Sequence, residues 1–168
     1  VYSGLNIDPE VSDLTISNVV FYLQTLKAPI QRDQNNADVI QGKNLFIQAG
    51  CESCHKQTLK TGFSNIEPLS NKIFHPYTDL LLHDMGTGLN DGYTEGNAKT
   101  FEWRTPPLWG LGLSPNSQGG EYFLMHDGRA KSIEAAIQLH GGEASVSKNK
   151  FNQMAAAERN NILKFLKS

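Results

Sequence analysis

The chain lacks the features that mark several common classes of protein. No apolar run in its 168 residues approaches the roughly 20 residues that a transmembrane helix needs. The formal net charge is −2, so no basic field indicates a nucleic acid as partner. Only two cysteines are present, and they lie so close in sequence that a disulfide between them would close a small, strained loop. These two thiols therefore serve another purpose.

The two cysteines belong to the motif C-x-x-C-H, formed by Cys51, Cys54 and His55. Two thiols at this spacing can reach the two vinyl groups on one edge of a porphyrin, and the following histidine then lies under the iron. A structural zinc site would need a second ligand pair, and the chain has no further cysteine. A thioredoxin-like redox motif would need a βαβ context, which the pattern lacks. The motif predicts one covalent haem c with His55 as the proximal iron ligand.

The residues just before the motif support this interpretation. A helix is predicted from about Asp38 to Ala49, and Gly50 is placed to end it. Gly42 and Phe46 lie one helical turn apart in this segment. The arrangement resembles the first helix of class I cytochromes c, in which such a glycine and aromatic residue pack against the closing helix. We therefore expect Gly42 to allow close approach of Phe165 or Leu166.

Apolar periodicity elsewhere predicts helices and no sustained strand. Helices are expected over Ser12–Lys27, Ser132–Leu139 and Ala156–Leu166, with short helical turns near Tyr77–His83. The remainder between Gln57 and Ser132 has an irregular pattern rich in proline and glycine. The predicted fold class is all-α, a cytochrome c-like helical domain with long loop insertions.

An internal similarity indicates the domain organisation. Val19–Leu26 and Asn161–Lys167 can be aligned so that Tyr22 matches Phe165, and both read like the closing helix of a cytochrome domain. On this interpretation residues 1–28 are the tail helix of a preceding, absent domain with the start of a linker, and residues 29–168 are a single cytochrome c domain. The alternative is a chance match between two amphipathic helices.

Longer segments resemble a known family. They are GCESCH (50–55), YTDLLLHDMGTGL (77–89), EWRTPPLWGLG (102–112), HDGRAKSIEAAIQLHGGEA (126–144) and the final ILKFLKS. From about Asp38 onward the chain resembles the C-terminal haem domain of the bacterial di-haem oxidoreductase (thiol-oxidoreductase-like) family, a relative of the di-haem cytochrome c peroxidases. A full member has a second C-x-x-C-H, and this chain has one. The resemblance therefore implies that the peroxidase-type haem lies in a missing half.

The second axial ligand of the iron has several candidates, because the chain offers four further histidines and three methionines: His75, His83, His126, His140, Met85, Met125 and Met154. In the related peroxidases this ligand, usually methionine, stands at the end of a helix that follows an aromatic–His–x–Gly stretch. Carried onto this sequence, the resemblance implies His140, and hence a bis-histidine iron with His55. Met125, Met85 and an open position remain as alternatives.

Other polar residues are candidates for the rim of the haem site. Arg104 could pair with a haem propionate in a bidentate, charge-assisted contact, although a structural arginine fits the pattern as well. His126 and Arg129 allow the same two interpretations. His83 is interpreted as a structural hydrogen-bonding residue. No catalytic residue is assigned from the sequence.

Two functions follow from these observations. The first is electron transfer, with two strong axial ligands and with either a redox partner protein or the missing N-terminal haem domain as partner. The second is a haem enzyme of peroxidase or thiol-oxidoreductase type with an open or displaceable iron site. Because haem attachment to C-x-x-C-H follows export in bacteria, the resemblance also implies a periplasmic location.

Overall fold

The computed structural model describes Gly4 and residues 9–168. Within that part six α-helices alternate with short 3₁₀ turns and four very short strands. The α-helices are α1 (Asp13–Gln24), α2 (Ala37–Ala49), α3 (Ser114–Ser117), α4 (Ile133–Leu139), α5 (Ser145–Gln153) and α6 (Ala156–Lys167). The strands are β1 (Leu59–Lys60), β2 (Ile73–Phe74), β3 (Leu82–Asp84) and β4 (Glu102–Arg104). No helix in the described residues is both long and apolar enough to cross a bilayer.

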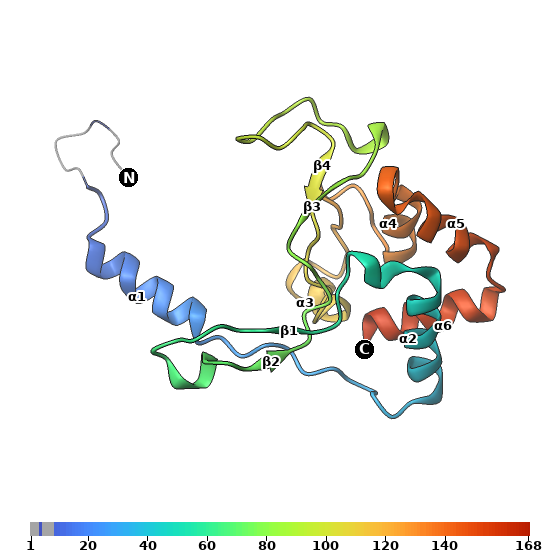
Figure 1. The fold of residues 1–168 in the computed structure, drawn as a ribbon, viewed down its shortest axis with the longest axis horizontal. Helices are drawn as coiled ribbons and strands as arrows, with labels where there is room; N and C mark the ends of the chain where they lie inside the picture. Colours follow the sequence, from blue (N-terminus) through green and yellow to red (C-terminus); the bar gives the residue numbers. More distant parts are fainter. Residues whose placement is uncertain (1–3, 5–8) are drawn as a thin grey trace.

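The packing of α2 against α6 forms the centre of the core (Figure 1). Asn36 caps α2 by accepting hydrogen bonds from backbone N–H groups of its first turn, as an N-cap residue does. A Cβ on Gly42 would overlap the carbonyl oxygen of Asn161 and lie 2.9 Å from the Cβ of Phe165. The close approach predicted for Gly42 and the closing helix is therefore confirmed. Buried apolar side chains fill both sides of this contact: Val39, Leu45, Phe46, Phe151, Ile162 and Phe165.

The all-α prediction is wrong. Two small antiparallel sheets are present, β1 with β2 and β3 with β4, so the fold is mixed although helices dominate. The turns expected near Tyr77–His83 are not helical, and an irregular stretch with positive φ at Tyr77 and Leu80 leads into β3. Each strand has only two or three residues, too short to produce a recognisable alternation of apolar and polar side chains. Their partners lie far along the chain, as His83 opposite Trp103 illustrates.

Helix α1 differs from the other long helices. Ser12 caps its start, since the hydroxyl accepts a hydrogen bond from the N–H of Thr15 at 3.2 Å. No residue of α1 is buried, and its apolar side chains, such as Val19 and Leu23, are about half exposed (51% and 58%). Figure 1 shows α1 projecting away from the helical core. The division at residue 28 stays a prediction.

Candidate functional site

The turn after α2 presents the C-x-x-C-H motif. Gly50 ends α2 with a φ of 85°, a left-handed conformation that glycine adopts without strain. A 3₁₀ turn over Cys51–Ser53 follows, and the N–H of His55 donates to the carbonyl of Cys51 at 3.0 Å. Both thiols are free, and both line one cavity together with His55. The local chain path therefore directs the whole motif into a single space.

This cavity has a volume of about 460 Å³, which is within the range of small-molecule and cofactor sites. Its walls are mainly apolar and come from α2, α4, α5, α6 and the loops around β4. They include Phe46, Leu89, Trp103, Leu108, Met125, Ile133, Ile137, Phe151, Ile162 and Leu166. An apolar cavity with two thiols and four imidazoles fits a planar, largely apolar iron cofactor better than a polar metabolite. The predicted haem is therefore chemically compatible with this lining.

Two of the histidines that line this cavity, His55 and His140, come from segments that are far apart in the sequence. The ring centroids of His55 and His140 lie 6.5 Å apart, with an interplanar angle of 43°. His140 is the residue at which α4 ends, and Ser132 caps the start of that helix. The sequence thus places the second imidazole at a helix end, and tertiary packing brings it opposite the first.

Each of these imidazoles has one nitrogen already committed. The Nδ1–H of His55 donates to the carbonyl of Tyr77 at 3.0 Å, and the Nδ1–H of His140 donates to the carbonyl of Ala136 at 2.8 Å. The Nε2 atom of each ring is then the unprotonated nitrogen, which is the form that binds a metal. Desolvation lowers the pKa of His55 to about 4 and also lowers the pKa of His140. Both rings are therefore neutral near pH 7.

The Tyr77 carbonyl is held firmly. Tyr77 has a φ of 56°, an unusual conformation for a residue other than glycine, and its ring packs edge-on against Phe46 and Phe165. The next residue, Thr78, is 1% exposed, and its hydroxyl donates to the carbonyl of Thr105 at 2.6 Å. Strained backbone of this kind persists where the surroundings fix it, and here it aims a carbonyl at His55.

The remaining predicted site residues lie on the same cavity. Arg104 lines it from β4, and its guanidinium donates to the carbonyl of Leu80. His126 lines it too and stacks on Trp103, with ring centroids 3.7 Å apart and an angle of 4°. Met85 and Met125 also reach the cavity, whereas His75 and Met154 do not line it. Six predicted residues are thus brought together: Cys51, Cys54, His55, Arg104, His126 and His140.

His83 has more contacts than the sequence could indicate. Its Nε2 lies 2.9 Å from a carboxylate oxygen of Asp79, and its Nδ1 lies 2.9 Å from one of Glu143. The Sγ of Cys54 lies 3.7 Å from the same Nδ1. Asp79 is four residues from His83, so a local pattern could have indicated their contact. Glu143 is distant in sequence, and no local pattern predicts its contact with His83.

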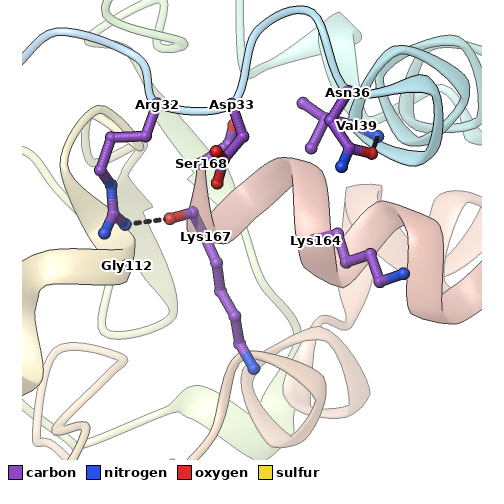
Figure 2. A pocket seen from close by; sticks show the side chains of 8 residues that line it. All are labelled: Arg32, Asp33, Asn36, Val39, Gly112, Lys164, Lys167 and Ser168. Carbon is purple, nitrogen blue, oxygen red and sulfur yellow. Dashed lines mark hydrogen bonds between the residues drawn. The ribbon is translucent and has the colours of Figure 1, made fainter.

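A second depression lies at the end of α6 (Figure 2). It has a volume of about 380 Å³ and is lined mostly by polar and charged side chains, among them Arg32, Asp33, Lys164 and Lys167. Arg32 donates to the carbonyl of Lys167, which ties the linker to the last turn of α6. No thiol or imidazole lines this depression, so it is not the predicted haem site.

Comparisons with known proteins identify a family and a similar fold. A family model described as "Di-haem oxidoreductase, putative peroxidase" matches residues 1–168. No curated protein matches the chain. A solved structure of hydrazine synthase from Kuenenia stuttgartiensis, pressurised with 20 bar xenon, is similar in fold with a TM-score of 0.58 at 16% sequence identity. The similarity covers 93% of this chain and 55% of the other, so this chain spans about half the length of that one.

Proposed function

The chain belongs to the di-haem oxidoreductase family and is a haem-binding redox protein, and on that premise we propose that it carries one haem c and transfers single electrons. The haem would be attached through Cys51 and Cys54, and His55 and His140 would bind the iron. The observation that carries the proposal is that both thiols and both imidazoles line one apolar cavity.

The separation of the two imidazoles supports bis-histidine ligation. Metal–nitrogen bonds to histidine are about 2 Å long, and the nitrogen lies roughly 1.1 Å from the ring centre, so two rings on opposite sides of one metal would have centres roughly 6.2 Å apart. The observed separation between His55 and His140 is 6.5 Å. The carbonyls of Tyr77 and Ala136 hold the two rings in the tautomer that ligation requires.

The residues of the chain would determine how the cofactor works. Bound haem supplies an iron that alternates between ferric and ferrous states. His55 and His140 would both bind the iron, and the apolar walls would keep water away from it. Arg104 and His126 are proposed to face the haem propionates at the rim of the cavity. An axial histidine in place of methionine favours a lower reduction potential.

A second candidate function is catalysis of the peroxidase or thiol-oxidoreductase type. The description of the matching family favours it, because it names a peroxidase as well as an oxidoreductase. It requires that the second axial position be open or that its ligand be displaceable. Peroxide added to the oxidised protein separates the two functions, because only an accessible iron would change its spectrum.

The domain organisation, the redox partner and the location of the protein are also proposed. The exposed apolar face of α1 supports the interpretation of residues 1–28 as the end of a preceding domain, with α1 as its tail helix, and of residues 29–168 as the cytochrome c domain. The preceding N-terminal haem domain, or a separate redox protein, would exchange electrons with the haem. Because haem attachment to C-x-x-C-H follows export in bacteria, the motif supports a periplasmic location.

The test is the optical spectrum of protein matured with haem, combined with its intact mass. We expect a mass increase of one haem that survives denaturation, and a six-coordinate low-spin spectrum that does not change with peroxide. A mass without haem would contradict the covalent attachment. A high-spin spectrum that responds to peroxide would support the enzyme instead.

A further inference from the structure

The charge state of His83 follows from its two partners. Both of its ring nitrogens lie 2.9 Å from carboxylate oxygens, one of Asp79 and one of Glu143. Ionised carboxylates only accept hydrogen bonds, and a neutral imidazole has only one N–H to donate. Both contacts can therefore be hydrogen bonds only when His83 is a protonated imidazolium. If the proton leaves, one carboxylate faces a nitrogen lone pair and is repelled.

These contacts connect the two sides of the haem cavity. Asp79 belongs to the loop that also contains Tyr77, whose carbonyl holds the proximal His55. Glu143 lies in the 3₁₀ turn Gly142–Ala144, immediately after His140 and Gly141. The second oxygen of Glu143 accepts a hydrogen bond from the N–H of Asp84 at 3.1 Å. The Asp79–His83–Glu143 cluster thus fastens the segment after His140 to strand β3.

Close backbone contacts reinforce the same junction. A Cβ on Gly141 would lie 2.6 Å from the carbonyl oxygen of Met85, and one on Gly86 would lie 2.8 Å from the backbone nitrogen of Gly142. The two segments therefore meet through glycine backbone. The Glu143 side chain adds two hydrogen bonds to this junction, one with the His83 ring and one with the N–H of Asp84.

We propose that protonated His83 is a positioning residue that holds His140 in place, and that loss of its proton loosens His140 and opens the sixth iron position to small ligands. This inference rests on the proposed function, because it takes His140 as the distal ligand. It connects the two candidate functions, since one iron site would be closed at neutral pH and accessible at higher pH.

The surroundings of His83 determine the direction of the pH effect. The groups that face it are Asp79 from the preceding loop, Glu143 from the turn after α4 and the Cys54 thiol, which haem attachment would convert to a thioether. His55 adds no charge in this pH range, because burial lowers its pKa to about 4. The hydrogen bond to Glu143 is the largest influence, and with Asp79 it raises the pKa of His83 above 6.5 despite desolvation. The cluster is therefore intact at neutral pH and is released as pH rises through the raised pKa.

The experiment measures the rate at which carbon monoxide binds the ferrous, haem-loaded protein as a function of pH. Carbon monoxide has no ionisable proton, so a pH dependence reports on the protein. In the wild type we expect a slow rate near neutral pH that rises roughly tenfold at alkaline pH, the size of effect that a charge-assisted hydrogen bond supports. His83→Gln should bind faster at neutral pH and lose the pH step.

Two further variants separate a specific role from a general structural one. In Glu143→Gln the largest influence that raises the pKa of His83 is removed, so the step should move to lower pH. His75→Gln is the matched control, because His75 is exposed and its Nδ1 contacts only the Thr58 hydroxyl, at 3.0 Å. Its pH profile should equal that of the wild type.

The outcomes can be distinguished. A wild-type rate that does not change with pH, or a step that persists unchanged in His83→Gln, overturns the inference while leaving the proposed function intact. His140→Ala tests the proposed function itself and should bind carbon monoxide rapidly at every pH. If carbon monoxide binds His140→Ala no faster than the wild type, His140 is not the distal ligand. That result would contradict both the proposed ligation and the inference about His83.

Discussion

The two sides of the haem cavity are built in different ways. On the proximal side Cys51, Cys54 and His55 lie within five consecutive residues, directly after a helix that is packed tightly against α6. On the distal side His140 ends a helix of seven residues and is followed by two glycines. On the proposed account the proximal side would rely on covalent haem attachment and on local sequence. The distal side relies on hydrogen bonds between segments that are far apart in the chain, and we propose that it is the side that opens.

The largest effect is expected from removing the covalent attachment on the proximal side. Cys51→Ser with Cys54→Ser should abolish the mass increase of one haem and leave a cavity whose apolar walls are exposed to water. Intact-mass measurement and haem staining after denaturing electrophoresis check the attachment. The control is the single variant Cys51→Ser, which should retain one thioether. Covalent haem in the double variant would contradict the attachment site.

Replacing the distal ligand should have the next largest effect, and it should leave the attachment unchanged. His140→Ala should retain the haem but become high-spin, bind exogenous ligands and have a higher reduction potential. Optical spectroscopy and redox titration measure these changes. Met85→Leu and Met125→Leu are matched controls, because both methionines line the same cavity. A low-spin spectrum that persists in His140→Ala and is lost in either methionine variant would assign the ligand to that methionine.

A smaller effect is expected where the proximal side is supported by helix packing. In Gly42→Ala the new methyl group overlaps the backbone of Asn161, so α2 and α6 must move apart. Overpacking of this kind typically lowers the free energy of unfolding by about 1–3 kcal/mol. Urea denaturation of the haem-loaded protein measures the loss. Gly62→Ala is the control, because a Cβ there meets nothing within 4 Å and should change stability little.

The smallest effect is expected in the pH dependence of stability on the distal side. The raised pKa of His83 implies a stabilising contribution that is complete below about pH 6.5, the unperturbed value, and is lost as pH rises through the raised pKa. Burial acts to raise the pKa of Asp79, but its hydrogen bonds with Leu81 N–H and His83 keep that pKa lowered. The contribution of Asp79 is therefore complete above about pH 4 and is lost on further acidification.

The difference in unfolding free energy between wild type and His83→Gln measures this contribution. It should be largest between about pH 4 and about pH 6.5 and should decline on both sides. The corresponding difference in unfolding free energy between wild type and His75→Gln should show no such plateau with pH. A difference that stays constant from acid to alkaline pH would mean that His83 acts through packing alone.

Local sequence patterns predicted the proximal side more completely than the distal side. Helix α2 was predicted from Asp38 to Ala49, within one residue of its observed bounds, because helical periodicity is a local signal. Gly42 was correctly predicted to lie against the closing helix, because the spacing of this glycine and Phe46 is also a local signal. Helix α4 and its Ser132 cap were also predicted correctly, and α6 ends within a residue of its expected position. Helix α5 was missed, because it is polar and buries only Phe151.

What the sequence could not predict depends on contacts between distant residues. Strands β1–β4 are too short to show alternation, and their pairing brings together residues such as Leu82 and Arg104. The same holds for the site. The contact of His83 with Glu143 and the stacking of Trp103 on His126 depend on how the loops fold over the cavity. The ligand role of His140 came from family resemblance and stays a prediction.

The most direct test of the central claim is the absorption spectrum of the ferric protein, recorded on material whose intact mass shows one covalent haem. Bis-histidine ligation by His55 and His140 predicts a six-coordinate low-spin spectrum without a methionine–iron charge-transfer band. The presence of that band would assign the distal position to a methionine. A high-spin spectrum would show an iron without a second strong ligand, and either result would contradict the account.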